Sequence, residues 1–328
     1  MIVPPNRANI ARAADLLRAG DVVAFPTETV YGLGADATNA EAVARIFEIK
    51  GRPRFDPLIV HAADFDQVRA LVTEIPAAAA RLAERFWPGP LTIVLPKTDR
   101  IPDIVTAGLS TVAVRVPDHP VALDLLRATE RPIAAPSANP FGYVSPTCAE
   151  HVAEQIGAHV SLILDGGPCR IGIESTIIAF MGGEPALLRP GGVPMEVIED
   201  VVGPTRIVTG GARPLAPGRL PSHYAPRTPL LLVRSAADVV PAHRSGGALL
   251  TRAPERDVAG FAHVEVLAAD GDLRRAAANL FAALRRLDAG AYTRIFAIEV
   301  PERGLGRAIM DRLRRAAGPP DPPSTPGQ

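Results

Sequence analysis

The sequence predicts an α/β protein in which a large open sheet carries helices on its faces and a smaller α/β domain follows. Short apolar runs alternate with stretches of helical periodicity over residues 1–203, a pattern typical of such sheets. Residues 204–228 are rich in Pro, Gly and Arg without periodicity, and we interpret them as an interdomain linker. A shorter strand and helix pattern occupies residues 229–317, and residues 318–328 are expected to be a disordered tail.

The individual elements follow from residue patterns, taken in order. Short apolar runs between turn residues predict buried strands at residues 22–25, 57–61, 91–96, 111–116, 132–135, 161–165, 175–180 and 185–190. Between them, apolar residues recur at helical spacing at 8–20, 39–51, 75–86 and 120–129. In the second domain we expect strands at 229–233, 247–251, 263–267 and 294–300 and helices at 273–290 and 304–317. Polar residues that follow several strands would lie at the sheet edge where α/β proteins bind ligands.

Composition excludes several classes of protein. The 35 Lys+Arg balance the 35 Asp+Glu, which argues against a general nucleic-acid coat protein and leaves a local basic groove open. Hydrophobic residues make up 47% of the chain and exclude wholesale disorder. The two cysteines, Cys148 and Cys169, are too few for a disulfide scaffold, so we expect the protein to work in a reducing cytoplasm. The sequence has no CxxC pair that could hold zinc, so we expect no protein-held metal. No apolar run approaches the roughly 18 to 20 residues of a membrane helix, so no membrane association is expected.

The segment FPTETVYGLGADA, residues 25–37, follows a predicted strand and precedes a helix. It combines the hydroxyl groups of Thr27 and Thr29 with two glycines, and such groups at a strand end suit ligand binding. GLGADA is also a loose GxGxxA dinucleotide fingerprint, but TETVY separates it from the strand, which weakens that interpretation. An ordinary polar turn is the alternative.

Two cations meet at the end of the helix predicted for residues 39–51. Lys50 lies at the end of the apolar stripe that faces the core, so its ammonium must reach solvent or meet an anion. Gly51 ends the helix, Arg52 follows, and Pro53 prevents continuation. A Lys point charge beside an Arg fork suits a polyphosphate. A favourable interaction of both cations with the helix dipole is the alternative.

Two further residues stand at strands of the same sheet. Arg115 shares a strand face with Ala113, whereas the neighbouring valines point the other way. An isolated guanidinium needs an acidic partner, either a protein carboxylate or a carboxylate substrate, and the sequence leaves both open. His61 ends another strand at the presumed ligand edge, where a structural role is the alternative to a functional one.

The loop AAPSANPFGYVSPT, residues 134–147, carries Ser137 and Ser145 on a chain stiffened by prolines. A rigid loop of this kind preorganises donors towards an anion or a nucleoside. Ser137 lies outside any GxSxG elbow and has no histidine close in sequence, which disfavours a covalent nucleophile. The chain also lacks a Walker P-loop, so we expect a site that works by positioning and electrostatic stabilisation more than by proton transfer.

In chain order, the segments FPTETVYGLGADA, KGRP with PLIVH, WPGPLT, TVAVRVPDHP, APSANPFGYVSPT, ILDGG, GIESTII and LLRPG resemble the YrdC-like family of threonylcarbamoyl-AMP synthases. The resemblance covers residues 8–203, and SHYAP in the linker with PERGLGRAIM near the end resembles the long, two-domain form. It implies a large YrdC-like open twisted mixed sheet with flanking helices and a smaller Rossmann-like α/β domain. It also implies a linker that covers the active site.

The resemblance implies a nucleotidyltransferase that converts L-threonine, bicarbonate and ATP into threonylcarbamoyl-AMP, diphosphate and water. This reaction is the first step in making threonylcarbamoyladenosine at position 37 of tRNAs, and cytoplasmic threonylcarbamoyl-transfer machinery would take up the product. ATP would be a substrate, Mg²⁺ is expected with it, and weak RNA binding is a further expectation. Matching positions imply the ATP-binding residues Lys50, Arg52, Asp56, Thr111, Ser137, Ser145, Arg189 and Tyr224. They imply the threonine-binding residues Thr29, His61, Arg115, Ala135 through its backbone, and Ser175.

We predict Lys50 and Arg52 to be the catalytic cations, because they would offset the charge on departing diphosphate. Asp56 departs from the Asn that the family commonly has at this position. A carboxylate there would repel phosphate unless it holds a sugar hydroxyl or Mg²⁺.

Three other functions compete with this one. A hydrogenase-maturation carbamoyltransferase carries a similar domain, but it should also have an acylphosphatase module and paired CxxC zinc sites, which two isolated cysteines exclude. An RNA-binding module with a basic groove would show salt-dependent RNA binding without threonine-dependent turnover. A nicotinamide oxidoreductase depends only on the weak GxGxxA segment and on GLGRAIM, residues 304–310.

Overall fold

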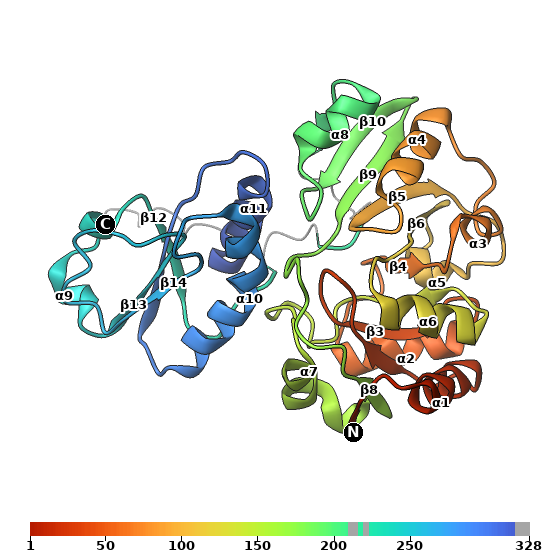
Figure 1. Cartoon of the computed structure of the whole chain (residues 1–328), viewed down its shortest axis with the longest axis horizontal. Coiled ribbons are helices and arrows are strands. Elements are labelled where there is room, and N and C mark those ends of the chain that lie inside the picture. The colour runs from red at the N-terminus through yellow and green to blue at the C-terminus, as the bar shows by residue number, and fades with distance from the viewer. Residues whose placement is uncertain (209–215, 219–222, 319–328) are drawn as a thin grey trace, which may run out of the picture.

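The structure is a computed structural model that describes residues 1–208, 216–218 and 223–318, and it forms two bodies, each built on one sheet (Figure 1). Within those residues the larger sheet has 11 strands in the order β1-β8-β2-β3-β7-β4-β6-β5-β9-β10-β11. They are β1 (Ile2–Val3), β2 (Val23–Phe25), β3 (Gly32–Asp36), β4 (Ile59–His61), β5 (Leu91–Pro96), β6 (Thr111–Arg115), β7 (Ile133–Ala134), β8 (Leu162–Leu164), β9 (Thr176–Met181), β10 (Glu184–Arg189) and β11 (Arg206–Ile207). Parallel pairs such as β4 with β6 and antiparallel pairs such as β5 with β6 both occur, so the sheet is mixed, as expected.

Helices pack on this sheet and begin and end where local sequence dictates. They are α1 (Arg7–Arg18), α2 (Ala40–Lys50), α3 (Phe65–Arg69), α4 (Ala77–Phe86), α5 (Asp103–Thr106), α6 (Pro120–Thr129), α7 (Ala149–Ile156), the 3₁₀ turn η1 (Gly157–His159) and α8 (Met195–Val202). In α2, the Asn39 side chain accepts hydrogen bonds from the backbone N–H groups of Glu41 and Ala42 and so caps the first turn. Gly51 ends the helix in the left-handed conformation, at φ 60°, as the sequence predicts.

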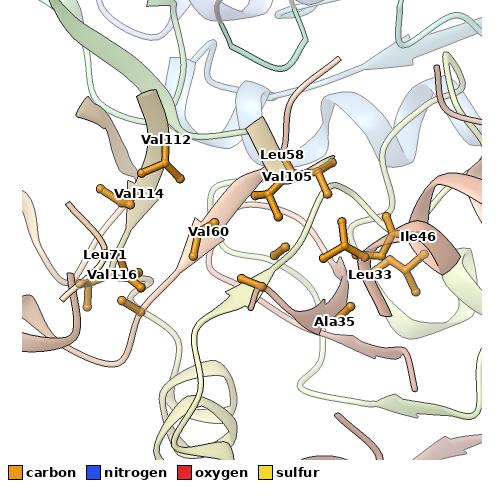
Figure 2. Packing of buried hydrophobic residues seen from close by; sticks show 14 of the residues in the cluster. Leu33, Ala35, Ile46, Leu58, Val60, Leu71, Val105, Val112, Val114 and Val116 are labelled. Atoms are coloured by element: carbon orange, nitrogen blue, oxygen red, sulfur yellow. The ribbon is translucent and has the colours of Figure 1, made fainter. Parts of the chain in front are cut away.

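The hydrophobic core lies between the sheet and these helices. Figure 2 shows Val112, Val114 and Val116 of the β6 segment directed into the same cluster as Val60 and Leu33. Ala113 and Ile59 belong to a different cluster on the other face of the sheet, and Ala216 of the expected linker also packs there. The alternation predicted for this strand is therefore present, and Arg115 lies on the face that linker residues partly cover.

The segment after β2 corrects one expectation. Residues 32–36 form strand β3, antiparallel to β2, rather than a ligand-binding turn between a strand and a helix. A Cβ atom on Gly34 would lie 2.7 Å from the Phe25 ring and 2.8 Å from Ile133, so the side chains of neighbouring strands exclude any larger residue. The dinucleotide interpretation of GLGADA is wrong for this reason. The two-residue strands β1 and β11 were not predicted from the sequence, and β11 lies within the expected linker.

The second sheet is entirely parallel, with the order β12-β15-β13-β14. Its elements are β12 (Leu230–Val233), the 3₁₀ turn η2 (Ala236–Asp238), α9 (Pro241–Arg244), β13 (Gly247–Thr251), β14 (His263–Val266), α10 (Leu273–Ala289), β15 (Arg294–Ile298) and α11 (Gly306–Ala317). In Figure 1, α10 and α11 lie between this sheet and the first domain. A parallel sheet with helices is what the expected Rossmann-like domain requires.

In the described part of the chain, no helix is both long and apolar enough to cross a membrane.

Candidate active site

Nine of the predicted site residues line one narrow cavity in the first domain. Its free volume is about 50 Å³, and the linker contributes Pro217, Gly218, His223 and Tyr224 to its walls. The predicted residues that line it are Thr29, Arg52, His61, Arg115, Ala135, Ser137, Ser175, Arg189 and Tyr224. A larger hollow of about 600 Å³ near α3 and α4 is bordered by Phe65, Trp87 and Pro88, but its walls lack a comparable set of converging buried cations. The polar cavity is therefore the candidate active site.

Arg115 is held on three sides at one end of the cavity. Its Nη2 lies 2.6 Å from Glu28 Oε1, Nη1 donates to Thr29 Oγ1 at 3.0 Å, and Nε donates to the Gly89 carbonyl at 3.1 Å. Glu28 is fully buried, and its contact with Arg115 is an ion pair by distance without the alignment of a hydrogen bond. The acidic partner that the sequence left open is thus a protein carboxylate. Glu28 was not among the predicted site residues, although it lies inside the TETV segment beside Thr29.

The hydroxyl groups and the histidine near Arg115 are equally fixed. Thr27 Oγ1 lies 2.8 Å from Thr29 Oγ1 and donates to the Val30 carbonyl at 2.7 Å. His61 is buried in contact with the edge of Phe25, their ring centroids being 6.2 Å apart. Burial, and then the positive charge of Arg115, lower the pKa of His61 to about 3. His61 is therefore neutral at physiological pH and can bind a ligand as a dipole.

Lys50 holds the serine loop. Its Nζ donates to the carbonyl oxygens of Ser137, at 2.7 Å, and of Asn139, and the Lys50 carbonyl accepts a hydrogen bond from the Phe141 N–H. Burial, and then the charge of Arg52, lower the pKa of Lys50 well below its ordinary value. The sequence required this ammonium to reach solvent or to meet an anion, but in the structure two backbone carbonyls bind it, and Lys50 does not line the cavity in this conformation.

Arg52 and Asp56 form a buried ion pair beside Lys50. Arg52 Nη2 lies 2.8 Å from Asp56 Oδ2, while its N–H groups donate to the carbonyls of Asp56 and Pro57. Burial raises the pKa of Asp56, although Arg52 opposes this shift. Asp56 itself does not line the cavity, so its carboxylate acts on the site through Arg52.

Arg189 joins the sheet to the linker. Its guanidinium donates to the Ser175 carbonyl at 2.9 Å, to Ser175 Oγ at 3.2 Å and to the Pro217 carbonyl at 3.3 Å. Ser175 Oγ lies 2.7 Å from the Thr92 hydroxyl. Tyr224 follows in the linker with φ 62°, a left-handed conformation that bulky residues rarely adopt and that is held here by the packing around its ring. Linker and strand therefore meet at the cavity.

The second domain contacts the cavity wall through Arg312, a residue that was not predicted from the sequence. Arg312 of α11 is fully buried; its Nε donates to Glu174 Oε2 at 2.7 Å and its Nη1 donates to the Pro190 carbonyl at 2.9 Å. Its guanidinium carbon lies 5.1 Å from the centre of the Tyr224 ring. Glu174 in turn accepts a hydrogen bond from the Ser145 hydroxyl at 2.6 Å. Burial lowers the pKa of Arg312, but the neighbouring Tyr224, Glu174 and Asp311 more than offset this and raise it overall.

Two of the predicted residues are less central. Ser145 is buried behind the cavity wall, where its hydroxyl is bound to Glu174, and Thr111 lies at the start of β6, four positions before Arg115 on the same strand face. Neither lines the cavity. Within residues 1–208, 216–218 and 223–318, no group of three or more His, Cys, Asp or Glu side chains is arranged to hold a metal ion.

Two family models match the chain in succession. The one described as "Telomere recombination" matches residues 15–191, and "Threonylcarbamoyl-AMP synthase, C-terminal domain" matches residues 193–318. The threonylcarbamoyl-AMP synthase of Pyrococcus abyssi is 48% identical and the alignment covers 93% of each chain. That of Bacillus subtilis is 46% identical over 95% of this chain and 94% of its own. The crystal structure of P. abyssi Sua5 complexed with L-threonine matches with a TM-score of 0.90 and 44% identity over 97% of each chain.

Fold and cavity define a two-domain α/β protein whose site gathers buried arginines around a small polar space, as an enzyme acting on anionic substrates requires. The chain belongs to the threonylcarbamoyl-AMP synthase family, in the form that carries both domains.

Proposed function

We propose that this chain makes threonylcarbamoyl-AMP from L-threonine, bicarbonate and ATP, releasing diphosphate and water. The observation that carries the proposal is the convergence of Arg52, Arg115 and Arg189, all buried, on one cavity bordered by hydroxyl groups. The reaction brings two anions together, an amino-acid carbamate and a nucleotide triphosphate. Buried guanidinium groups lower the cost of that encounter, because they act in a medium of low dielectric constant.

Threonine is assigned to the Arg115 end of the cavity. Its carboxylate would bind the Arg115 fork, which Glu28 and Thr29 hold in a fixed orientation before the ligand arrives. Neutral His61, the Ala135 backbone and Ser175 would complete this side. Because His61 stays neutral, Arg115 supplies the positive charge on this side of the cavity.

ATP is assigned to the side bordered by Arg52, Ser137, Arg189 and Tyr224. Arg52 and Arg189 would bind phosphate oxygens, while Thr111 and Ser145 would contribute from the periphery. Lys50 would act chiefly by holding the Ser137 loop in place, since its ammonium is already bound to two carbonyls of that loop. Asp56 would orient Arg52 and lower its net attraction for phosphate.

In the proposed reaction, the threonine nitrogen and bicarbonate form a carbamate with loss of water. A carbamate oxygen then attacks the α-phosphorus of ATP, an O–P bond forms, the bond to the bridging oxygen breaks, and diphosphate leaves with the negative charge. The arginines offset this charge. Mg²⁺ would enter bound to the ATP phosphates and neutralise part of their charge, because the described residues offer no three-ligand cluster of their own.

The linker must move for this chemistry to occur. About 50 Å³ of free volume is far below the several hundred Å³ that nucleotide-sized ligands require. Pro217, Gly218, His223 and Tyr224 form the wall that can open, because they are the part of the lining that comes from the expected linker. We therefore infer that the described conformation is closed and that ATP enters after the linker is displaced.

Several consequences of the proposal concern other molecules. The product would be consumed by a threonylcarbamoyl transferase acting on tRNA, and this places the protein in the cytoplasm. Arg52, Arg115 and Arg189 do not support the RNA-binding alternative, since these side chains are buried and cannot form an open basic groove. Weak RNA binding through surface arginines stays a prediction.

The proposal is tested by following the carbon of labelled bicarbonate. With ATP and threonine present, the label should appear in a nucleotide product that alkaline treatment breaks down to AMP. Arg115→Lys should raise the threonine KM about tenfold or more, because it replaces a two-point contact with one. Label that enters the product equally well without threonine would contradict the proposal.

A further inference from the structure

The glycine segment at residues 304–310 lies at a second hollow, which the proposed reaction does not use. This hollow has a volume of about 420 Å³, within the range of small-ligand sites. It is bordered by Arg252, Arg274, Arg303, the segments 271–273 and 304–305, Pro301, and Pro194 of the first domain.

The hollow lies at the carboxyl edge of the parallel sheet. Arg252 directly follows β13, and Pro301 and Arg303 come shortly after β15. β13 and β15 are neighbours, but the chain leaves them in opposite directions: β13 connects to β14 on one side, and β15 connects to α11, which packs beside β12 on the other. The crevice between two such strands is the usual ligand position in open α/β sheets.

The charge at this crevice suits an anion. Three arginines and one carboxylate, that of Asp272, line it. The Asp272 carboxylate already accepts hydrogen bonds from the backbone N–H groups of Arg274 and Arg275 at the start of α10. Arg274 and Arg303 are exposed, and within the described ranges neither guanidinium has an ion-pair partner. Two free forks that face one crevice are suited to bidentate recognition of phosphate.

The backbone at the crevice is shaped for close approach. A Cβ atom on Gly306 would lie 1.9 Å from the Pro301 carbonyl oxygen, so only glycine permits this tight turn from β15 into α11. Gly271 has φ 70°, and its carbonyl accepts a hydrogen bond from Arg252 Nη1, which joins the loops after β13 and β14. The neighbouring Gly304 N–H already donates to a carboxylate oxygen, Oε1 of Glu196 in the first domain, at 3.3 Å. The turn thus already binds one carboxylate oxygen, which an incoming anion would have to displace to reach the Gly304 N–H.

We propose that this crevice, formed by the loops after β13, β14 and β15 and carrying Arg252, Arg274 and Arg303, is a binding site for a phosphorylated ligand of nucleotide size. It is separate from the catalytic cavity and shares no lining residue with it. The segment GLGRAIM is not a dinucleotide fingerprint, because Ile309 stands where the pattern needs Gly or Ala. Its glycines serve the phosphate crevice.

The test is the binding stoichiometry of ADP to the full chain, measured by calorimetry. If the proposed function also holds, wild-type protein should bind two ADP molecules per chain, one of them at the catalytic cavity. Arg274→Ala/Arg303→Ala should lose one of the two, or weaken it at least tenfold. The matched control, Arg12→Ala/Arg81→Ala, removes two exposed arginines on α1 and α4 and should bind as wild type does.

The outcomes separate the two proposals. If the catalytic assignment fails while the crevice binds ADP, stoichiometry falls to one and Arg274→Ala/Arg303→Ala abolishes it. If ADP binding is identical in wild type and Arg274→Ala/Arg303→Ala, the crevice proposal is overturned. It is also overturned if the double variant loses binding of a short RNA but not of ADP, since the arginines would then serve a nucleic-acid surface.

Discussion

Replacing Arg312 with Leu should damage both stability and ATP binding, because one buried guanidinium connects the second domain to the catalytic cavity. Arg312 is fully buried and contacts Glu174 at 2.7 Å, Asp311 at 2.6 Å and the Pro190 carbonyl at 2.9 Å. Removing one member of a buried ion pair leaves the other charge without compensation, at a cost of about 3–5 kcal/mol. We expect the free energy of unfolding to fall by about that amount.

The control variant is Arg314→Leu on the same helix. Arg314 pairs with Glu302, but its side chain is 50% exposed. Exposed pairs contribute at most about 1 kcal/mol, so this variant should lose little stability. Urea unfolding of both variants under the same conditions measures the difference.

The double variant Arg312→Leu/Glu174→Leu distinguishes the effect of an unpaired buried charge from the effect of lost side-chain packing. Because both charges are gone, it should recover most of the stability lost in Arg312→Leu. It should not recover activity, since Glu174 lines the cavity and binds Ser145.

The kinetic readout distinguishes a positioning role from general damage. Ser145 and Tyr224 belong to the proposed ATP side, so Arg312→Leu should raise the ATP KM about tenfold or more and leave the threonine KM nearly unchanged. Equal changes in both KM values, or a stability loss below about 1 kcal/mol, would refute the reasoning.

Three further predictions follow from other contacts of the cavity. Asp56→Asn removes the carboxylate 2.8 Å from Arg52, so the ATP KM should fall while the free energy of unfolding drops by about 1–3 kcal/mol; a higher ATP KM would show that Asp56 contacts the nucleotide favourably. Glu28→Gln removes the negative charge beside Arg115 while Thr29 and Gly89 still hold the guanidinium, so the threonine KM should fall with little change for ATP; steady-state kinetics with each substrate varied will measure this, and unchanged constants would remove Glu28 from the site. The folded-state pKa of His61, about 3, lies below its ordinary 6.5, so its contribution to stability is complete above pH 6.5 and is lost as pH falls towards 3. Between pH 6 and 5 the wild type should lose about 1.2 kcal/mol more than His61→Gln, as urea unfolding at the two pH values would show, and equal slopes would mean that His61 is not buried as a neutral side chain.

The sequence could predict that Arg115 and the neighbouring valines lie on opposite faces of their strand, because strand periodicity depends only on local geometry. It could not predict that Glu28 would be the partner, since that contact joins residues 87 positions apart and depends on how the sheet is ordered. The order of strands is a property of the whole chain and leaves no local signal. Nine of the predicted residues line one cavity, but the sequence could not predict their order around it, because that order depends on the order of the strands.

The errors have a comparable physical origin. Gly32 and Gly34 looked like a flexible turn, because glycine is the usual residue at a phosphate loop. In the structure they make room for Phe25 and neighbouring side chains inside the sheet, a requirement set by strands distant in sequence. Arg312 could not be predicted for the opposite reason: it lies on a helix rich in arginine whose other arginines stay exposed or half-buried, and it is buried where the second domain meets the first.

The central claim is that one cavity condenses threonine, bicarbonate and ATP. The most direct measurement is diphosphate release from ATP by the full chain, with threonine and bicarbonate added separately and together. The account predicts rapid release only when both are present, because the attacking oxygen belongs to the carbamate that they form. Diphosphate released at the same rate without threonine would contradict it.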